Sequence, residues 1–368
     1  MSDTRRTGFG HFPALDGLRG LALAGVLLFH AQGTLVGGYL GVDLFFVLSG
    51  FLITGLLCAE HEATHGIALR DFWIRRARRL LPALVALMPA IALYAWFVVA
   101  PHERHGLRLD ALATLGYVAN WRALLANKSY WDLFAAPSPL EHTWSLAIEE
   151  QFYLLWPLVV AFVLRAKGRR TLFGVTLVLT ALSIVAMLVL YDPKQPSRVY
   201  LGTDTRAAGL FVGALLAMRL EPSKALAGAR RTSLDALGFA ALVGLAVAWT
   251  RLEGSSPLLY RGGLWLTELG VLVLIACATV GREGLVARLL AVPPLRWLGT
   301  LSYGAYLWHW PVDVVLTPER TGLAFGPRLY GLQLAVTFAA ALASYIAVEQ
   351  PIRQHGLRVR RPVVVTSG

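Results

Sequence analysis

Three ionisable side chains stand inside the first two apolar runs of the chain, where a lipid bilayer would strongly disfavour them. Arg19 and His30 lie in the run 18–36, and Asp43 opens the run 41–59. The 11 residues between Arg19 and His30 make about three helical turns and a rise of about 16 Å, so the two side chains share one face. A guanidinium binds phosphate well, and an imidazole is the commonest general base. The pattern suits a reaction in which an anionic carrier is held at one surface while chemistry occurs deeper in the membrane.

Each of these residues also has a structural interpretation. Arg19 could extend to the lipid headgroups, and His30 could be a packing histidine. Asp43 could cap the helix that it opens. Alternatively, the short uncharged loop between the two runs brings Asp43 to His30, where the carboxylate would orient the imidazole and stabilise its protonated form.

Seven motifs, in order along nearly the whole chain, resemble the acyltransferase-3 family of membrane O-acyltransferases. They are PALDGLRGLALAGVLLFH (13–30), GVDLFFVLSGFLI (41–53), FWIRRARRLLPAL (72–84), HTWSLAIEEQFYLLWP (142–157), DTRAAGLFVGALLA (204–217), LSYGAYLWHWP (301–311) and VEQPIR (348–353). The resemblance implies transfer of an acyl group, usually acetyl from acetyl-CoA, to a hydroxyl on a glycan or another acceptor.

Arg76 and Arg79 are the paired arginines that the family pattern places before Leu-Leu-Pro. Three residues apart, they share a helix face. With Arg19 they are expected to bind the phosphates of coenzyme A, because guanidinium groups match phosphate oxygens. The alternative is that the cluster, which also includes Arg75 and Arg78, only orients its helix in the membrane.

Glu149 and Glu150 are two further candidates, within an otherwise apolar helix. Adjacent residues point about 100° apart on a helix, so at most one is expected to face the cavity of His30. Asp204 and Arg206 are spaced to pair with each other or to cap a helix. No metal-ligand spacing is present, and both cysteines lie in apolar runs.

A rival motif, His105 to Asp110, matches the H-x-x-x-x-D of glycerolipid acyltransferases. Nine histidines in the chain make one chance match unsurprising. The motif also falls in a segment that we expect outside, away from cytosolic acyl-CoA. We therefore discount it.

Composition indicates a polytopic membrane protein. Of the 368 residues, 56% are hydrophobic and only 15% are charged, too few to cover a soluble domain. The net charge of +12 sits in short basic clusters between apolar runs, which is typical of cytoplasmic loops and not of nucleic-acid binding. We predict an all-α bundle of about ten transmembrane helices, at 18–36, 41–59, 80–100, 142–164, 172–191, 206–220, 234–250, 264–281, 297–316 and 329–348.

The positive-inside rule orients this bundle. With both termini cytoplasmic, 22 of the 34 Lys and Arg residues fall in inner segments and 11 in outer ones. The segment 107–126 is polar enough to be ambiguous, and a span there would move the strongest basic loops outside. We expect it to be an additional interfacial or re-entrant helix within an external segment, 107–141.

We predict a single transmembrane acyltransferase domain, 1–350, and a short basic cytoplasmic tail, 351–368. Some family members carry a further extracytoplasmic hydrolase-like domain. That domain is expected to be absent here, so a second transfer step outside would need a separate extracytoplasmic transferase.

The preferred hypothesis is an O-acyltransferase of the cell membrane that uses acyl-CoA, expected to be acetyl-CoA, and no metal, to modify a cell-envelope glycan or lipid-linked saccharide. His30 would take the acceptor's proton or briefly carry the acyl group. The alternatives are acylation of a small secondary metabolite such as a macrolide, and a non-enzymatic transporter or flippase whose buried charges line a pathway. The bilayer, acyl-CoA and the hydroxyl acceptor are the expected partners, with no nucleic acid.

Overall fold

The structure, a computed structural model, describes residues 10–31, 34–126, 138–222 and 224–355. Within these ranges the regular elements are all helical, and no strand occurs. The predicted all-α class is therefore confirmed. The tail predicted at 351–368 is helical to residue 355, and its remainder, 356–368, lies outside the described residues.

Seven helical segments are long and apolar enough to cross a membrane, and each coincides with one of the ten predicted runs. They are η1 and α2 (Gly38–Thr64), α3 (Leu69–Phe97), η3 and α6 (Glu141–Ala166), α7 (Arg169–Leu190), α10 (Gly228–Arg251), η4 and α11 (Leu259–Thr279), and α15, η5 and α16 (Pro327–Gln354). The chain is accordingly a polytopic membrane protein.

The other three predicted spans coincide with α1 (Pro13–His30), α9 (Thr203–Ala217) and α13 (Pro293–Val315). The 15 residues of α9 rise about 22 Å, less than the roughly 30 Å of a hydrocarbon core. Ionisable side chains within these helices, such as Arg19 in α1, Arg206 in α9 and His309 in α13, lower their apolar character. The count of ten spans remains a prediction.

The ambiguous segment 107–126 forms two short helices, α4 (Arg104–Leu115) and α5 (Ala119–Leu125). They are separated by a turn in which Tyr117 adopts a φ of 55°. The 12 residues of α4 rise about 18 Å, too little to cross a bilayer. The two short helices agree with an interfacial or re-entrant segment, whose place in the membrane stays a prediction, and residues 127–137 of the expected external segment lie outside the described residues.

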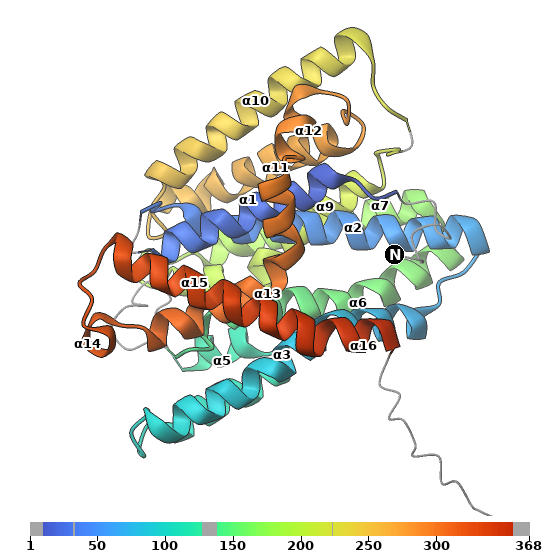
Figure 1. Ribbon diagram of the computed structural model, residues 1–368. Coiled ribbons are helices and arrows are strands. Elements are labelled where there is room, and N and C mark those ends of the chain that lie inside the picture. Colours follow the sequence, from blue (N-terminus) through green and yellow to red (C-terminus); the bar gives the residue numbers. More distant parts are fainter. Residues whose placement is uncertain (1–9, 32–33, 127–137, 223, 356–368) are drawn as a thin grey trace, which may run out of the picture.

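Glycines set the closest helix contacts at the centre of the bundle. A Cβ atom on Gly299 of α13 would lie 1.8 Å from the Asp16 carbonyl oxygen of α1, and one on Gly50 of α2 would lie 1.8 Å from the Leu210 carbonyl of α9. Only glycine permits such backbone approach, which is how helices commonly pack in membranes. Figure 1 shows α1 and α2 crossing the middle of the molecule, with α10 along one edge and the far half of α3 along the opposite edge.

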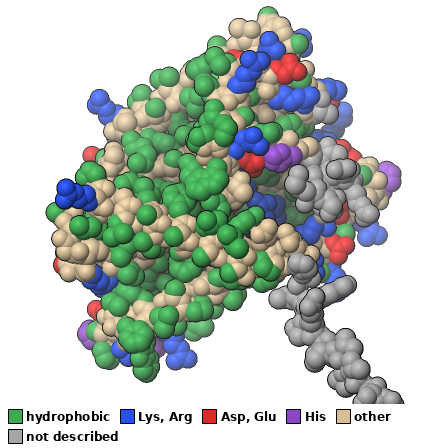
Figure 2. All heavy atoms as spheres, viewed as in Figure 1, with side chains coloured by type: hydrophobic (Ala, Val, Ile, Leu, Met, Phe, Trp, Pro, Cys, Tyr) green, Lys and Arg blue, Asp and Glu red, His purple; other side chains and the backbone are tan. Residues whose placement is uncertain are grey.

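Hydrophobic side chains cover most of the face in Figure 2, and Lys and Arg side chains gather mainly at its right-hand end. Leu154, Leu155 and Phe162 of α6 are 57%, 59% and 74% exposed. A broad apolar face of this kind suits contact with lipid and not with water. The remaining short helices are α8 (Ser197–Leu201), α12 (Leu285–Leu290) and α14 (Pro318–Thr321).

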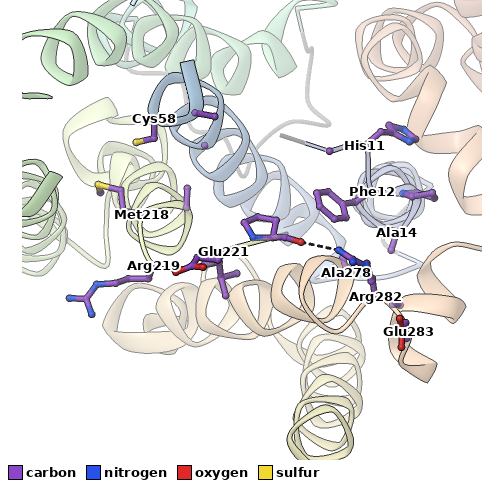
Figure 3. Close-up of a pocket in the computed structure, with 18 of the residues that line it drawn as sticks. His11, Phe12, Ala14, Cys58, Met218, Arg219, Glu221, Ala278, Arg282 and Glu283 are labelled. Carbon is purple, nitrogen blue, oxygen red and sulfur yellow. Dashed lines mark hydrogen bonds between the residues drawn. The ribbon is translucent and has the colours of Figure 1, made fainter. Parts of the chain in front are cut away.

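Segments predicted to share one side of the membrane meet at one end of the molecule. A cavity of about 1220 Å³, the end cavity, is lined by residues from the start of α1, the end of α2, the α6–α7 turn, the end of α9 and the α11–α12 region. Figure 3 shows it, with Arg282 donating to the Pro222 carbonyl at 3.0 Å. All five segments were predicted inside. The grouping is confirmed, and the orientation in the membrane stays a prediction.

Candidate functional site

The three arginines predicted to hold the donor lie around one cavity. Arg19 of α1 and Arg76 and Arg79 of α3 line a space of about 60 Å³ between α1, α2, α3, α6 and α13, which we name the arginine cavity. Glu149 of α6 lines it as well. Since Arg76 and Arg79 are both within the helix α3, their expected common face is observed.

These guanidinium groups have little to neutralise them. Among the described residues, no hydrogen bond or ion pair engages the side chain of Arg19, Arg76 or Arg79. The guanidinium of Arg76 lies 5.1 Å from the centroid of the Tyr153 ring. The Glu149 carboxylate is bound by the Ser49 hydroxyl at 2.7 Å instead. Three cations thus face one carboxylate, so the cavity favours an anionic ligand.

Glu150 does not line the arginine cavity. It lies near Tyr117, since burial first, and the Glu150 carboxylate second, raise the pKa of the Tyr117 phenol above its usual range, and it also interacts electrostatically with Arg76. Neither glutamate is among the described residues that line the cavity of His30, which was the predicted location, and Glu149 lines the cavity of the arginines.

His30 lies at the other end of α1, beside a second space of about 630 Å³ that we name the His30 cavity. Its Nδ1 lies 2.9 Å from the Val26 carbonyl oxygen. Since a carbonyl only accepts, Nδ1 carries the proton of the neutral ring, and Nε2 keeps its lone pair. The imidazole is therefore oriented as a base by its own helix backbone.

Two further histidines connect the two cavities. The His309 ring lies 4.9 Å from the His30 ring and 5.2 Å from the His142 ring, between centroids. Tyr306, which lines the arginine cavity, lies 5.2 Å from His309 and shares a hydrogen bond of 2.6 Å with Ser145. This aromatic group lies between the arginine cavity and His30.

The sequence alone predicted no catalytic role for His142 or His309. Each lies in a motif that carried the family resemblance, at 142–157 and 301–311. Membership in these motifs was the feature of the sequence that could have indicated a role for the two histidines. Their proximity depends on how α6 and α13 pack, which spacing along the chain does not reveal.

Asp43 is not the partner of His30, contrary to expectation. Its carboxylate pairs with Arg206 of α9 at 2.9 Å, and both side chains are buried, at 0% and 1% exposure. The Arg206 guanidinium also lies against the rings of Phe46, Trp144 and Tyr200. The possible pairing of Asp204 with Arg206 is wrong as well, because Asp204 binds Arg198 at 2.7 Å.

The reason for the separation is the path of the chain after α1. A Cβ on Gly38 would lie 2.2 Å from the Gly25 carbonyl, and one on Gly41 would lie 2.3 Å from the Ala22 carbonyl. The segment therefore turns back along α1, and α2 begins beside Ala22. His30 is eight residues further on, a rise of about 12 Å.

The rival motif is not assembled. His105 is exposed, whereas Asp110 is partly buried and lines the His30 cavity. Five residues turn a helix by about 140° beyond one full turn, so the two side chains of α4 point apart. Among the described residues, no group of three His, Cys, Asp or Glu side chains is arranged to hold a metal ion.

Comparison with known proteins agrees with the motifs. The sequence profile of the acyltransferase-3 family, an acyltransferase domain, matches residues 12–348. The chain belongs to this family. No solved structure matches significantly.

Three relatives illustrate the similarity. Peptidoglycan O-acetyltransferase OatA of Listeria monocytogenes is 40% identical over 370 residues, covering 97% of this chain and 58% of the relative. The putative peptidoglycan O-acetyltransferase YrhL of Bacillus subtilis is 42% identical, covering 95% and 56%. O-acetyltransferase OatA of Staphylococcus aureus is 38% identical, covering 95% and 58%. The chain thus spans somewhat more than half the length of these relatives.

Proposed function

We propose that this protein transfers an acetyl group from acetyl-CoA to a hydroxyl of a cell-envelope glycan. The observation that carries the proposal is the arginine cavity, where three guanidinium groups have no ion-pair partner among the described residues. Coenzyme A carries several phosphate charges, and guanidinium groups bind phosphate by charge-assisted hydrogen bonds. The arginines therefore suit the phosphates of an acyl-CoA, of which a space of about 60 Å³ holds only a part.

The cavity also points the donor toward His30. It extends from the arginines to Tyr306 and Ser145, beside His142 and His309. With phosphates at Arg19, the extended pantetheine arm would cover the rise of about 16 Å along α1 toward His30. The thioester would then meet the histidines at the deep end of the cavity.

In the proposed reaction, Nε2 of His30 takes the proton of the acceptor hydroxyl, and the oxygen attacks the thioester carbonyl. The carbon–sulfur bond breaks, and the leaving thiolate takes the proton back from the imidazolium to give free CoA. The Val26 carbonyl, which holds Nδ1–H at 2.9 Å, keeps the ring in the required tautomer. An alternative mechanism with the same residues transfers the acyl group briefly to His30 itself.

The glycan acceptor is inferred from the relatives, two of whose names state peptidoglycan O-acetylation. We assign Asp43 a structural role, because its buried pair with Arg206 fixes α2 against α9. We place the arginine cavity toward the cytosol, which supplies acetyl-CoA, with both termini on that side.

Purified protein in vesicles, without any ion gradient, tests the proposal. Addition of acetyl-CoA and a soluble peptidoglycan fragment should release free CoA thiol and leave labelled acetyl on the glycan. A protein that moves either compound across the vesicle membrane with the thioester intact would be a transporter, and the proposal would be wrong.

A further inference from the structure

The His30 cavity has the opposite charge to the arginine cavity. It lies between the end of α3, α4, the end of α13, α14 and α15. Four carboxylates line it, Glu103, Asp110, Asp313 and Glu319, of which Asp110 pairs with Arg122 at 3.5 Å, and among the described lining residues the one arginine is Arg320. The Arg320 guanidinium is already engaged, donating to the Val314 carbonyl at 2.9 Å. A phosphate-bearing donor is disfavoured in such a space.

Asp313 is the carboxylate closest in sequence to the histidine group, one turn beyond Trp310 and four residues after His309. Trp310 also lines the cavity and lies 4.8 Å from the His30 ring. Among the described residues, no hydrogen bond or ion pair engages the Asp313 carboxylate. A partly buried carboxylate without a partner is available to accept hydrogen bonds from a ligand.

Beside aliphatic residues such as Leu107 and Val314, the lining also contains aromatic and amide side chains. The rings of Tyr94 and Phe325 line the cavity, and Phe325 is 66% exposed. Gln333 donates to the Leu316 carbonyl at 3.0 Å, which leaves its amide oxygen as an acceptor. Flat rings suit the apolar C–H faces of a sugar, and acceptor oxygens suit its hydroxyls. The volume, about 630 Å³, is in the range of ligand sites.

We propose that the His30 cavity is the acceptor site and that it binds a neutral polyhydroxyl ligand, a saccharide, with Asp313 accepting hydrogen bonds from its hydroxyls. The inference rests on the proposed function for the role of His30. Donor and acceptor would then reach the histidines from two cavities of opposite charge. Asp313 acts in acceptor binding and specificity, and takes no part in proton transfer.

The test measures acceptor and donor kinetics of Asp313→Asn with a soluble β-1,4-linked N-acetylglucosamine tetramer. Loss of charge-assisted hydrogen bonds should raise KM for the tetramer roughly 10-fold to 100-fold, with kcat and the KM for acetyl-CoA nearly unchanged. Asp192→Asn removes an exposed carboxylate outside the cavity and should change nothing. Because Phe325 is exposed, Phe325→Ala should leave folding intact, and it should raise the KM for the tetramer severalfold.

Direct binding separates this inference from the proposed reaction. Tetramer binding, followed by saturation-transfer NMR, should persist in His30→Gln and weaken in Asp313→Asn. If the wild-type protein and its variants bind the tetramer in this pattern but the wild-type protein transfers no acetyl group to it, the acceptor site stands and the proposed function fails. The acceptor site would be overturned if Asp313→Asn and Phe325→Ala bound the tetramer as well as the active wild-type protein does. It would also be overturned if the active wild-type protein did not bind the tetramer.

Discussion

At the scale of single residues, the site depends on which charges are already paired. Arg206 and Asp43 satisfy each other in the interior, so they stabilise the fold. Removing one member of such a pair leaves an uncompensated buried charge, which typically costs about 3–5 kcal/mol. Arg19, Arg76 and Arg79 have no comparable partner among the described side chains. That difference, more than the residue types, separates structural from ligand-binding arginines.

Arg76→Ala and Arg79→Ala are each expected to weaken acetyl-CoA binding. Each change removes charge-assisted contacts worth roughly 1.5–3 kcal/mol, or about 10-fold to 150-fold in Kd. Lysine should restore binding only partly, because it lacks the guanidinium fork. Arg78→Ala, in the same cluster but outside the cavity, is the matched control. If both folded alanine variants bound acetyl-CoA as tightly as wild type, the arginine cluster would serve only to orient its helix in the membrane.

The two adjacent glutamates should behave differently. Glu149→Gln removes the only carboxylate among the lining residues of the arginine cavity that we describe, so it should change the KM for acetyl-CoA by severalfold or more. Glu150→Gln, one residue further and outside that lining, should leave donor kinetics nearly intact. Steady-state kinetics of both variants provide the comparison. Equal effects of the two changes would contradict the assignment of Glu149 to the donor cavity.

At the scale of elements, residue patterns predicted the helices well and their contacts poorly. Apolar runs near 20 residues marked α2, α3, α6, α7, α10, α11 and α15, because lipid requires such runs wherever a helix faces it. The predicted pairing of Asp43 with His30 was wrong, because the length of the loop limits how far the chain can travel but does not determine in which direction it turns. The glycines at 38 and 41 let the backbone pack directly on α1, and that approach moves Asp43 about two turns away from His30.

Gly299→Ala should disrupt the crossing of α1 and α13. The added Cβ would meet the Asp16 carbonyl oxygen at 1.8 Å, so the helices must separate, at a cost of about 1–3 kcal/mol. Because α1 carries His30 and α13 carries His309, transfer should fall as well. Gly244→Ala in α10, with nothing within 4 Å of the new Cβ, should be neutral or stabilising by up to about 1 kcal/mol. Thermal unfolding in detergent gives the comparison, and equal Tm values for the two variants would argue against the close crossing.

At the scale of the whole molecule, two cavities of opposite charge flank one aromatic group of histidines. The sequence predicted in part which segments lie together, since five segments predicted to be cytoplasmic meet around the end cavity. The histidine group could not, because His30, His142 and His309 come from three helices far apart in the sequence. Nothing in their local patterns encodes that meeting.

The orientation in the membrane is a prediction that thiol labelling tests. Single cysteines at Arg78 and Arg108, both exposed positions, should be labelled by a membrane-impermeant thiol reagent from opposite sides, with position 78 cytoplasmic. The two native cysteines, Cys58 and Cys277, are buried and provide little background. Labelling of both positions from one side would contradict the orientation and the proposed supply of donor from the cytosol.

The central claim is that acyl transfer depends on His30 while donor binding depends on the arginines. The most direct measurement determines both quantities on one sample of folded His30→Gln protein. Glutamine keeps much of the size but offers no ring nitrogen to take the proton, so acetyl transfer should fall at least 100-fold, the lower bound of typical general-base catalysis of about 10²–10⁴. The Kd for acetyl-CoA should stay within about twofold of wild type, because the arginine cavity is unchanged. Transfer at near the wild-type rate by this variant would show that the proton goes elsewhere, and the account of His30 would be wrong.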